Sequence, residues 1–361
     1  MKNNLYIGVM SGTSMDAIDI ALCEITGKTC KLIHFSEYPF KAQLKEDILN
    51  TINGVTTLKQ LGIIDKKLAL LYSDAINTFL REYKLDANSI ELIGLHGQTL
   101  WHEPDSEFPF SMQLGCASTV VAQTGIKVVN DFRSMDVANG GQGAPFAPAF
   151  HQFLFANLEE KSAVLNIGGM ANITLLGSDL RGWDTGCGNV LLDMWIQKCQ
   201  NKAYDKDGAF AKSGRVNQEL LNAMLSDDYF KKAPPKSTGR EYFNENFLAN
   251  HLPIFNTIKD EDIQRTLLEL TAQSITEDVK KFQIKQLIVC GGGAKNSFLI
   301  QRLATLTDIK VQTSDALGVN GDALEAMAFA WLAYKRLHNE AVDLKMVTGA
   351  KRNSLLGGIY G

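Results

Sequence analysis

The sequence lacks several features that mark whole classes of protein. No long run of Lys and Arg stands anywhere in its 361 residues, and the formal net charge is -4. A nucleic-acid-binding surface is therefore not expected, because binding phosphates requires clustered cations. No apolar stretch reaches about 18 residues, so no membrane span is expected. The N-terminal stretch MKNNLYIGVM has no signal-peptide core of adequate length and enters a strand near Leu5, so we expect a cytoplasmic protein.

Cysteine pairs are missing as well. The six cysteines stand at positions 23, 30, 116, 187, 199 and 290, and none of them forms a C-x-x-C spacing. Most lie in apolar runs, so reduced and buried thiols are expected. No cluster has the spacing of metal ligands, and we expect structural roles for His102 and His151.

Two nucleotide-binding signatures are also absent. The sequence has no G-x-x-x-x-G-K-[ST], and no G-x-G-x-x-G that opens a βαβ unit with a following acid. It has three other glycine turns instead: SGTS at 11–14, NIGGMAN at 166–172 and CGGGAKN at 290–296. Glycine lets backbone N–H groups approach an anion closely, so phosphate is a natural ligand of such turns. Each turn alone is a weak signal, and the three in this order are a stronger one.

Hydrophobic periodicity predicts an α/β chain. Residues 5–38 alternate as a meander of three strands, and 162–177 repeat the pattern of strand, glycine turn and strand. This echo indicates a degenerate internal duplication, although chance also fits, since any two β-hairpins share this much. The other predicted elements are helices at 41–52, 57–83, 115–125, 188–199, 261–282 and 321–337, a strand that ends at His96, a strand at 126–130, and a strand, turn and helix at 285–304.

The chain is long enough for two cores, being 45% hydrophobic over its 361 residues. The Gly/Pro-rich stretch 138–148 is the best candidate for a domain crossover. We expect one lobe to comprise residues 1–135 plus about 343–361, because the tail RNSLLGGIYG should pack back on the first domain. The second lobe is expected to comprise residues 136–342.

Seven ordered blocks together cover nearly the whole chain: GVMSGTSMDAIDIAL (8–22), HGQT (96–99), NDFRSMDVANGGQGAPFAP (130–148), LNIGGMANIT (165–174), DTGCGN (184–189), PPKSTGREYF (234–243) and GGGAKN (291–296). They resemble anhydro-N-acetylmuramic acid kinase, within the actin/hexokinase/Hsp70 superfamily of ATP-binding proteins. The resemblance implies two actin-like (ribonuclease H-like) α/β lobes with a central ATP and substrate cleft.

The resemblance also implies an activity. Members of this family hydrolyse the 1,6-anhydro ring of 1,6-anhydro-N-acetylmuramic acid and phosphorylate O6 from ATP. The products are N-acetylmuramic acid 6-phosphate and ADP, and the reaction belongs to peptidoglycan recycling. Mg²⁺ and a homodimer are implied in the same way. One alternative is another kinase of the superfamily, against which HGQT and DTGCGN in this order argue. The other is a filament or chaperone ATPase, which should carry an appended module; the chain ends soon after its last helix.

By the same resemblance, the glycine turns bind ATP. Asp16 or Asp19 could hold Mg²⁺ through water, because magnesium prefers to keep waters. A capped hairpin with solvated acids fits these residues equally well. The family usually has glycine at the position of Ala17. The implied ATP-binding residues are Gly12, Thr13, Ser14, Met15, Asp16, Ala17, Ile18, Asp19, Gly168, Gly169, Gly292 and Gly293.

Two carboxylates are the implied catalytic residues. The family's catalytic aspartate corresponds to Asp184, which would deprotonate the water that attacks the anomeric carbon. The residues alone also fit an N-cap of the following helix. Glu325 could contact the same water, or it could belong to a buried ion pair. Family members commonly have proline at the position of Cys187, and this thiol is not expected to be a nucleophile because neither His nor Lys is adjacent.

The resemblance places the sugar site at HGQT and NDFR. His96 and Gln98 would bond hydroxyls or the lactyl group, and a strand-end histidine beside glycine is otherwise often structural. Arg133, with Asp131, suits the lactyl carboxylate because a guanidinium offers a bidentate fork. A surface Asp–Arg pair is the alternative. Lys236 and Arg240 could lie near phosphate or in a loop that orders on closure.

Overall fold

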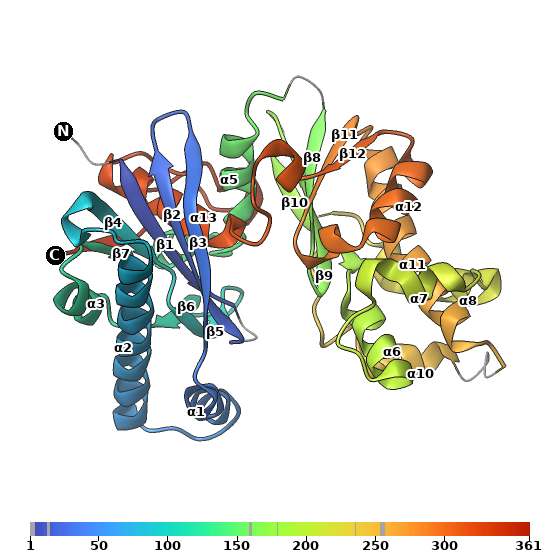
Figure 1. Cartoon of the computed structure of the whole chain (residues 1–361), viewed down its shortest axis with the longest axis horizontal. Coiled ribbons are helices and arrows are strands. Elements are labelled where there is room, and N and C mark those ends of the chain that lie inside the picture. Colours follow the sequence, from blue (N-terminus) through green and yellow to red (C-terminus); the bar gives the residue numbers. More distant parts are fainter. Residues whose placement is uncertain (1–3, 13–14, 159–160, 179, 235, 253–256) are drawn as a thin grey trace. The chain divides into compact units, whose positions relative to one another are not determined.

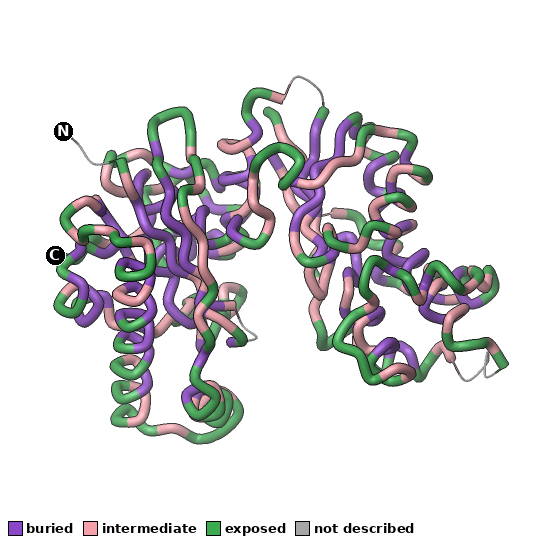
Figure 2. Tube along the Cα trace, in the orientation of Figure 1, coloured by how far each residue is buried: buried purple, intermediate pink, exposed green. Residues whose placement is uncertain are grey.

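The computed structural model describes residues 4–12, 15–158, 161–178, 180–234, 236–252 and 257–361. The chain divides into two compact units (Figure 1). Unit 1 comprises residues 1–154 with 323–361, and unit 2 comprises residues 155–322. Each unit has its own buried core, centred on its strands (Figure 2). No helix in the described ranges has the length and apolar character needed to cross a membrane.

Unit 1 is built on a six-stranded sheet in the order β13-β7-β4-β1-β2-β3. The first three strands form the predicted antiparallel meander, and β1, β4 and β7 run parallel. The C-terminal strand β13 pairs with β7, so the tail packs back on the first unit as predicted. The strands are β1 (Leu5–Ser11), β2 (Ala17–Ile25), β3 (Cys30–Pro39), β4 (Ile90–Leu95), β7 (Val128–Asn130) and β13 (Gly358–Tyr360).

Helix α13 (Leu324–Leu337) crosses one face of this sheet at very short distance. A Cβ on Gly8 would lie 1.7 Å from the carbonyl oxygen of Ala326, and a Cβ on Gly94 would lie 2.0 Å from that of Phe329. Only glycine permits this approach of a helix to two strands. The predicted buried helix at 321–337 is thus confirmed, and its burial explains two glycines inside strands.

The other face of the sheet packs against helix α2 (Leu58–Glu82), with which Ile7 and Val9 share one core (Figure 1). Further elements of unit 1 include a hairpin of β5 and β6, which the sequence pattern did not predict. These elements are α1 (Ala42–Asn53), β5 (Gln98–Glu103), β6 (Phe110–Leu114), α3 (Ala117–Thr124), α4 (Ser134–Ala138), α5 (Ala147–Leu154) and α14 (Lys345–Thr348).

Unit 2 repeats the topology of unit 1. Its sheet has the order β10-β9-β8-β11-β12, in which β8, β9 and β10 are antiparallel and β8, β11 and β12 are parallel. Strand by strand this matches β3-β2-β1-β4-β7, the order of a ribonuclease H-like lobe. The strands are β8 (Ser162–Ile167), β9 (Met170–Leu175), β10 (Arg181–Cys187), β11 (Gln286–Cys290) and β12 (Lys310–Thr313).

The repeated topology supports a duplication, because the two glycine hairpins, β1–β2 and β8–β9, occupy equivalent places in two sheets of the same order. The predicted fold class, two actin-like α/β lobes, is confirmed. The helices of unit 2 are α6 (Val190–Gln200), α7 (Ala209–Ser213), α8 (Gln218–Leu225), α9 (Asp228–Lys231), α10 (Glu245–His251), α11 (Asp260–Lys281) and α12 (Ser297–Thr307).

The unit boundaries differ from the expected lobe limits. The Gly/Pro-rich stretch 138–148 stays within unit 1, and the chain passes into unit 2 after Leu154. It returns at Ala323, ahead of α13, rather than near residue 343. The reason is packing: Phe150 of α5 contacts Trp331 of α13 at a ring distance of 5.6 Å, and α13 lies on the sheet of unit 1.

Candidate active site

Asp184 lies on strand β10, at a bulge. Asp184 pairs with Asn172 of β9, but Gly186 pairs with the next residue, Ala171, so Thr185 is an extra residue in the ladder. A bulge bends its strand and re-aims the neighbouring side chains, and bulges are frequent beside active sites. Helix α6 begins only at Val190, with Asn189 at its N-cap position. The interpretation of Asp184 as a helix N-cap is therefore wrong.

The segment 236–238 holds Asp184 through both its backbone and its side chain. The N–H of Asp184 donates to the carbonyl of Lys236 at 3.0 Å, and the N–H of Thr238 donates to Asp184 Oδ2 at 2.9 Å. Tyr229 donates its hydroxyl to the Asp184 carbonyl at 2.8 Å. Among the described residues, no donor bonds Asp184 Oδ1, so this oxygen is available to a ligand.

The environment of Asp184 suits a base. Burial raises the pKa of this carboxyl above its ordinary value, and the charge of Glu241 adds to the rise. The Thr238 N–H and the Lys236 ammonium oppose it. A raised pKa makes a carboxylate a stronger proton acceptor, as a general base requires.

The second glycine turn, Gly168–Gly169, is fixed by the start of α6. Gly188 and Val190 donate backbone N–H groups to the carbonyl of Gly169, at 2.9 Å and 3.1 Å. The guanidinium of Arg240 lies 3.9 Å from the position of a Cβ on Gly169. The sequence left the role of Arg240 open. Its guanidinium is a cation beside a phosphate-type turn, which is a position suited to binding phosphate.

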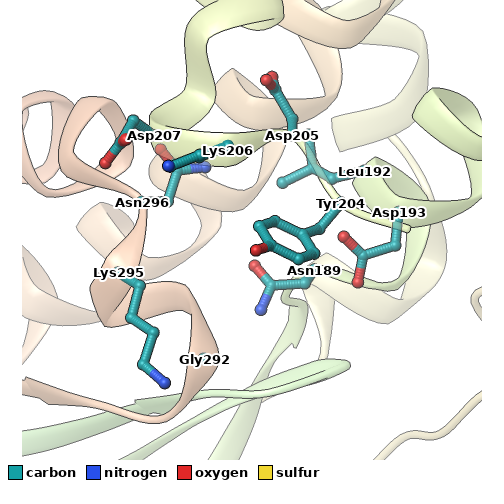
Figure 3. Close-up of a pocket in the computed structure, with 10 residues that line it drawn as sticks. All are labelled: Asn189, Leu192, Asp193, Tyr204, Asp205, Lys206, Asp207, Gly292, Lys295 and Asn296. Carbon is teal, nitrogen blue, oxygen red and sulfur yellow. The ribbon is translucent and has the colours of Figure 1, made fainter. Parts of the chain in front are cut away.

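A cavity of about 500 Å³ opens beside the third glycine turn (Figure 3). In Figure 3, Tyr204, Asn189 and Asp193 lie together on one side, and Gly292, Lys295 and Asn296 lie on the other. Burial raises the pKa of Asp193 to about 6, and the charge of Arg240 opposes the rise. The cavity is lined by Asn189, Leu192, Asp193, Tyr204, Asp205, Lys206, Asp207, Gly292, Lys295 and Asn296.

The two glycines predicted in this turn do different things. Gly292 lines the cavity. Gly293 faces the protein interior, where an added Cβ would lie 2.4 Å from Ile167 Cγ2. The third turn thus offers Gly292 to a ligand, while Gly293 allows the turn to pack on the end of β8.

The first glycine hairpin, in unit 1, is only partly described, because the predicted Thr13 and Ser14 lie outside the described residues. Met15 and Ile18 are buried in the core of unit 1, so only their backbone can face a ligand. Asp16 is exposed and pairs with Lys45 Nζ at 2.9 Å. The remaining predicted residues are Gly12 in the turn, Ala17 at the start of β2, and Asp19 within β2.

Gln98 ties the HGQT segment to this hairpin. Its side chain is buried, and its Oε1 accepts a hydrogen bond from Ser11 Oγ at 2.9 Å. Its Nε2 donates to the carbonyl of Gly12 at 3.4 Å. Gln98, predicted to bind the sugar, thus has both ends of its amide engaged within the protein.

His96 and Arg133 form a buried cation–imidazole pair in unit 1. Arg133 donates from Nε and Nη2 to His96 Nε2, at 3.2 Å and 2.9 Å. A guanidinium only donates, so Nε2 accepts and the imidazole proton lies on Nδ1. Nδ1 is buried and has no hydrogen-bond partner among the described residues. Burial, with Arg133 beside it, lowers the pKa of His96 to about 3, so the ring is neutral.

The alternatives for Asp131 and Glu325 can also be assessed. Asp131 is exposed and accepts from the N–H of Ser134 at 3.4 Å, so the proposed surface pair with Arg133 is wrong. Glu325 is exposed in the first turn of α13 and has no ion-pair partner among the described residues. The exposure and the missing partner contradict the buried ion pair. The helix dipole stabilises an acid in a first helical turn, so Glu325 needs no partner there. Desolvation by the surrounding protein nevertheless raises the pKa of Glu325, and the positive charge of Arg133 opposes this rise.

Comparison with known proteins decides the family. The family model of the anhydro-N-acetylmuramic acid kinases matches residues 4–361. The chain belongs to this kinase family. It is 56% identical to the anhydro-N-acetylmuramic acid kinase of Sulfurovum sp. (strain NBC37-1), with 100% of both chains covered. It is 48% identical to that of Pasteurella multocida (strain Pm70), with 98% of this chain and 96% of the relative covered. Component A of the Acidaminococcus fermentans (R)-2-hydroxyglutaryl-CoA dehydratase, a solved structure, has a TM-score of 0.49 at 13% identity, covering 92% and 99%.

Membership in this kinase family makes the chain an enzyme. The surroundings of Cys187 decide whether its thiol could act as a nucleophile. Cys187 is buried, and its Sγ contacts Thr271 Oγ1 at 3.9 Å. Burial raises the pKa of this thiol to about 12. The thiol is thus protonated and inert, as expected from the sequence.

The two histidines for which the sequence predicts structural roles both lie in unit 1. His102 is exposed on β5 and contacts Ser111 Oγ at 2.9 Å, while His151 is buried in α5. Within the described ranges, no group of His, Cys, Asp and Glu side chains could hold a metal ion by itself.

Several residues of this candidate site were not assigned a role by sequence reasoning. Asn189 is the last residue of DTGCGN, and Asp193 lies in the first turn of α6, where a helix start beside a glycine turn was a usable signal. Tyr204 and Tyr229 stand in segments without a recognisable pattern. Only the fold brings them to the cavity and to Asp184.

Proposed function

We propose that this chain is an ATP-dependent kinase that hydrolyses the 1,6-anhydro ring of 1,6-anhydro-N-acetylmuramic acid and phosphorylates O6. The products are N-acetylmuramic acid 6-phosphate and ADP, which places the reaction in peptidoglycan recycling. The observation that carries the proposal is Asp184 in a chain that the family model matches over residues 4–361: a half-buried carboxylate on a bulge, with one oxygen held by Thr238 and the other available.

In the proposed mechanism, Asp184 removes a proton from the water that attacks the anomeric carbon. The C1–O bond to O6 breaks, and O6 takes the electron pair. O6 then attacks the γ-phosphorus of ATP, the bond from that phosphorus to the β,γ-bridging oxygen breaks, and ADP leaves. The proton of the water resides on Asp184 Oδ1 and passes to solvent. One base thus serves both reactions, because ring opening itself creates the alkoxide nucleophile.

The nucleotide is assigned to unit 2. The cavity of about 500 Å³ has the size of a nucleoside site and offers an aromatic ring, amides and carboxylates to base and ribose. The Gly168–Gly169 turn and the guanidinium of Arg240 suit the phosphate groups. Asp193 lies between these two features, since it lines the cavity and interacts with Arg240.

The sugar is assigned to His96 and Arg133 in unit 1. The buried Nδ1–H of His96 is a donor without a partner in the described residues, and a hydroxyl or carbonyl of the sugar would satisfy it. Arg133 supplies the positive charge that suits the lactyl carboxylate. Glu325, exposed at the start of α13, is the proposed second carboxylate for the attacking water.

Mg²⁺ fits the carboxylates of the first hairpin. Asp16 and Asp19 are oxygen ligands at a phosphate-type turn, which is the donor chemistry magnesium prefers. When bound through water with ATP, the ion supplies neutralisation of phosphate charge. A homodimer in the cytoplasm remains a prediction from the family resemblance.

The test is a direct assay. Purified protein is incubated with Mg-ATP and 1,6-anhydro-N-acetylmuramic acid, and ADP release and the mass of the sugar product are followed. A product heavier by one phosphoryl group and one water, absent in Asp184→Asn, supports both reactions. N-Acetylmuramic acid is the control substrate for a plain sugar kinase. ADP release that does not depend on sugar contradicts the proposal and points to a motor-like or chaperone-like ATPase.

A further inference from the structure

Asp136 is a buried carboxylate three residues after Arg133, and the proposed mechanism does not use it. Its side chain is 2% exposed, and it forms no ion pair with any described residue. Its Oδ1 accepts from Thr348 Oγ1 at 2.9 Å, and its Oδ2 accepts from the N–H of Gly143 at 2.8 Å. Burying a carboxyl group is costly unless it is hydrogen-bonded, and these two contacts offset that cost.

The loop 140–143 wraps around this carboxylate. A Cβ on Gly141 would lie 2.3 Å from Asp136 Oδ2, so the backbone passes closer than any other residue permits. The N–H of Gly141 donates to the Asp136 carbonyl at 2.9 Å, and the N–H of Gln142 donates to the Thr348 carbonyl at 2.9 Å. Asp136 and Thr348 together therefore fix the path of this loop.

The loop in turn fixes Arg133. The carbonyl of Gly143 accepts from Arg133 Nη1 at 3.0 Å, while Nε and Nη2 donate to His96 Nε2. A guanidinium is a rigid planar fork, so holding one nitrogen sets the direction of the other two. The face of Phe146, 5.4 Å from the guanidinium carbon, limits rotation of the plane.

We propose that Asp136 is a positioning residue for the sugar site: it fixes the Gly143 carbonyl, which holds Arg133 in line with His96. The inference rests on the proposed function, in which His96 and Arg133 bind the sugar. It also makes α14 near the C-terminus part of the sugar site, because Thr348 supplies one of the two hydrogen bonds to Asp136.

The test uses Asp136→Asn, which keeps the shape and offers one acceptor oxygen where the loop and Thr348 need two. We expect the KM for 1,6-anhydro-N-acetylmuramic acid to rise about tenfold, while kcat and the KM for ATP stay within about twofold. In an Arg133→Ala background the same substitution should have no further effect on the sugar KM, because the two act in series. The matched control is Asp262→Asn, where Asp262 Oδ1 accepts the N–H of Arg215 at 2.6 Å in unit 2.

Two results would overturn the proposal. One is an equal rise of both KM values, which indicates a general loss of structure. The other is an unchanged sugar KM in a folded Asp136→Asn protein. If Asp136→Asn does not fold, Thr348→Val removes one of the two contacts and should give a smaller rise of the sugar KM alone; no rise overturns the proposal.

A readout that is independent of the reaction separates this proposal from the proposed function. In the wild type, ¹⁵N NMR of the His96 ring should show the Nδ1–H form, because Arg133 donates to Nε2. Asp136→Asn should shift the ring toward a mixture of the two neutral forms. Unchanged ring signals overturn the positioning role, whereas a wild type without sugar-dependent ADP release overturns only the proposed function.

Discussion

The hydroxyl of Tyr229 donates a hydrogen bond of 2.8 Å to the backbone carbonyl of Asp184. The Tyr229 side chain is almost fully buried, and its ring faces Lys236 Nζ at 4.9 Å. The carbonyl of Lys236 accepts a hydrogen bond from the N–H of Asp184. Both backbone polar groups of Asp184 are therefore hydrogen-bonded, the N–H to Lys236 and the carbonyl to Tyr229. The direction of the Asp184 carboxylate therefore depends on a contact between residues 45 positions apart.

Tyr229→Phe tests this relationship. The substitution removes the hydroxyl and keeps the ring, so the contact with Lys236 remains. We expect kcat to fall roughly fivefold with little change in either KM, and the free energy of unfolding to fall by about 1 kcal/mol. Steady-state kinetics and urea unfolding measure the two effects. The matched control is Tyr242→Phe, which removes a hydroxyl bound to Asp227 in the same aromatic cluster. Equal losses of kcat in both variants would contradict the role of Tyr229.

Asp184→Asn should remove the proposed general base while keeping the shape of the side chain. We expect kcat to fall about a thousandfold, because an amide cannot accept the proton of the attacking water. The KM values should change little, since Asp184 acts on the water rather than on the sugar or nucleotide. Single-turnover formation of the phosphorylated sugar is the measurement. A variant that retains more than roughly a tenth of the wild-type rate would show that another group is the base.

The same substitution should stabilise the protein at neutral pH. The pKa of Asp184 is raised by burial above its ordinary value of 3.8, so folding favours the protonated form. Between the unfolded and the folded pKa the native state binds more protons, and stability falls as pH rises through this window. An asparagine carries no charge, so it avoids the free-energy cost of desolvating the ionised carboxylate. We expect Asp184→Asn to unfold at higher urea than the wild type near pH 7, with the difference shrinking toward pH 4. A difference that grows at low pH would contradict the raised pKa.

Binding of the nucleotide should depend on the protonation of Asp193. Burial raises the pKa of this carboxyl to about 6, and its charge interacts with Arg240 beside the Gly168–Gly169 turn. As pH falls through about 6, the carboxylate is neutralised and Arg240 loses its partner. We therefore expect the KM for ATP to rise below this pH in the wild type. Asp193→Asn should show a flat KM over the same range, and an unchanged inflection in that variant would assign the titration to another group.

Local sequence patterns predicted most of the fold. Alternation predicted the first meander, and the apolar periodicity of 321–337 predicted the buried helix α13. The hairpin β5–β6 was missed because half of β5, from Trp101 to Glu103, is exposed and carries no alternation. The glycines of DTGCGN indicated a turn, but Gly186 lies in a strand, where a Cβ would meet the ring of Phe230 at 2.7 Å.

The site was only partly predictable, for a different reason. Asp184 and the glycine turns lie in short local motifs that a sequence displays directly. The contacts that position them join distant residues, such as Thr238 with Asp184 and Arg133 with His96. No local pattern encodes which loop reaches a carboxylate across the fold. Gln98 is the opposite case: it lies in a recognisable motif, but the motif did not indicate that its side chain forms hydrogen bonds with Ser11 and Gly12 of the first hairpin.

The close approach of α13 to the sheet gives a prediction about stability alone. Gly8→Ala places a Cβ 1.7 Å from the Ala326 carbonyl oxygen, and neither a strand nor a buried helix can move away cheaply. We expect a loss of at least about 3 kcal/mol in the free energy of unfolding, or no soluble protein. Gly62→Ala is the matched control, because Gly62 lies in α2 with nothing within 4 Å of its Cβ position. That variant should gain about 1 kcal/mol from helix propensity. Urea unfolding at one pH measures both, and a Gly8→Ala protein as stable as the wild type would mean that α13 does not lie on β1 at this distance.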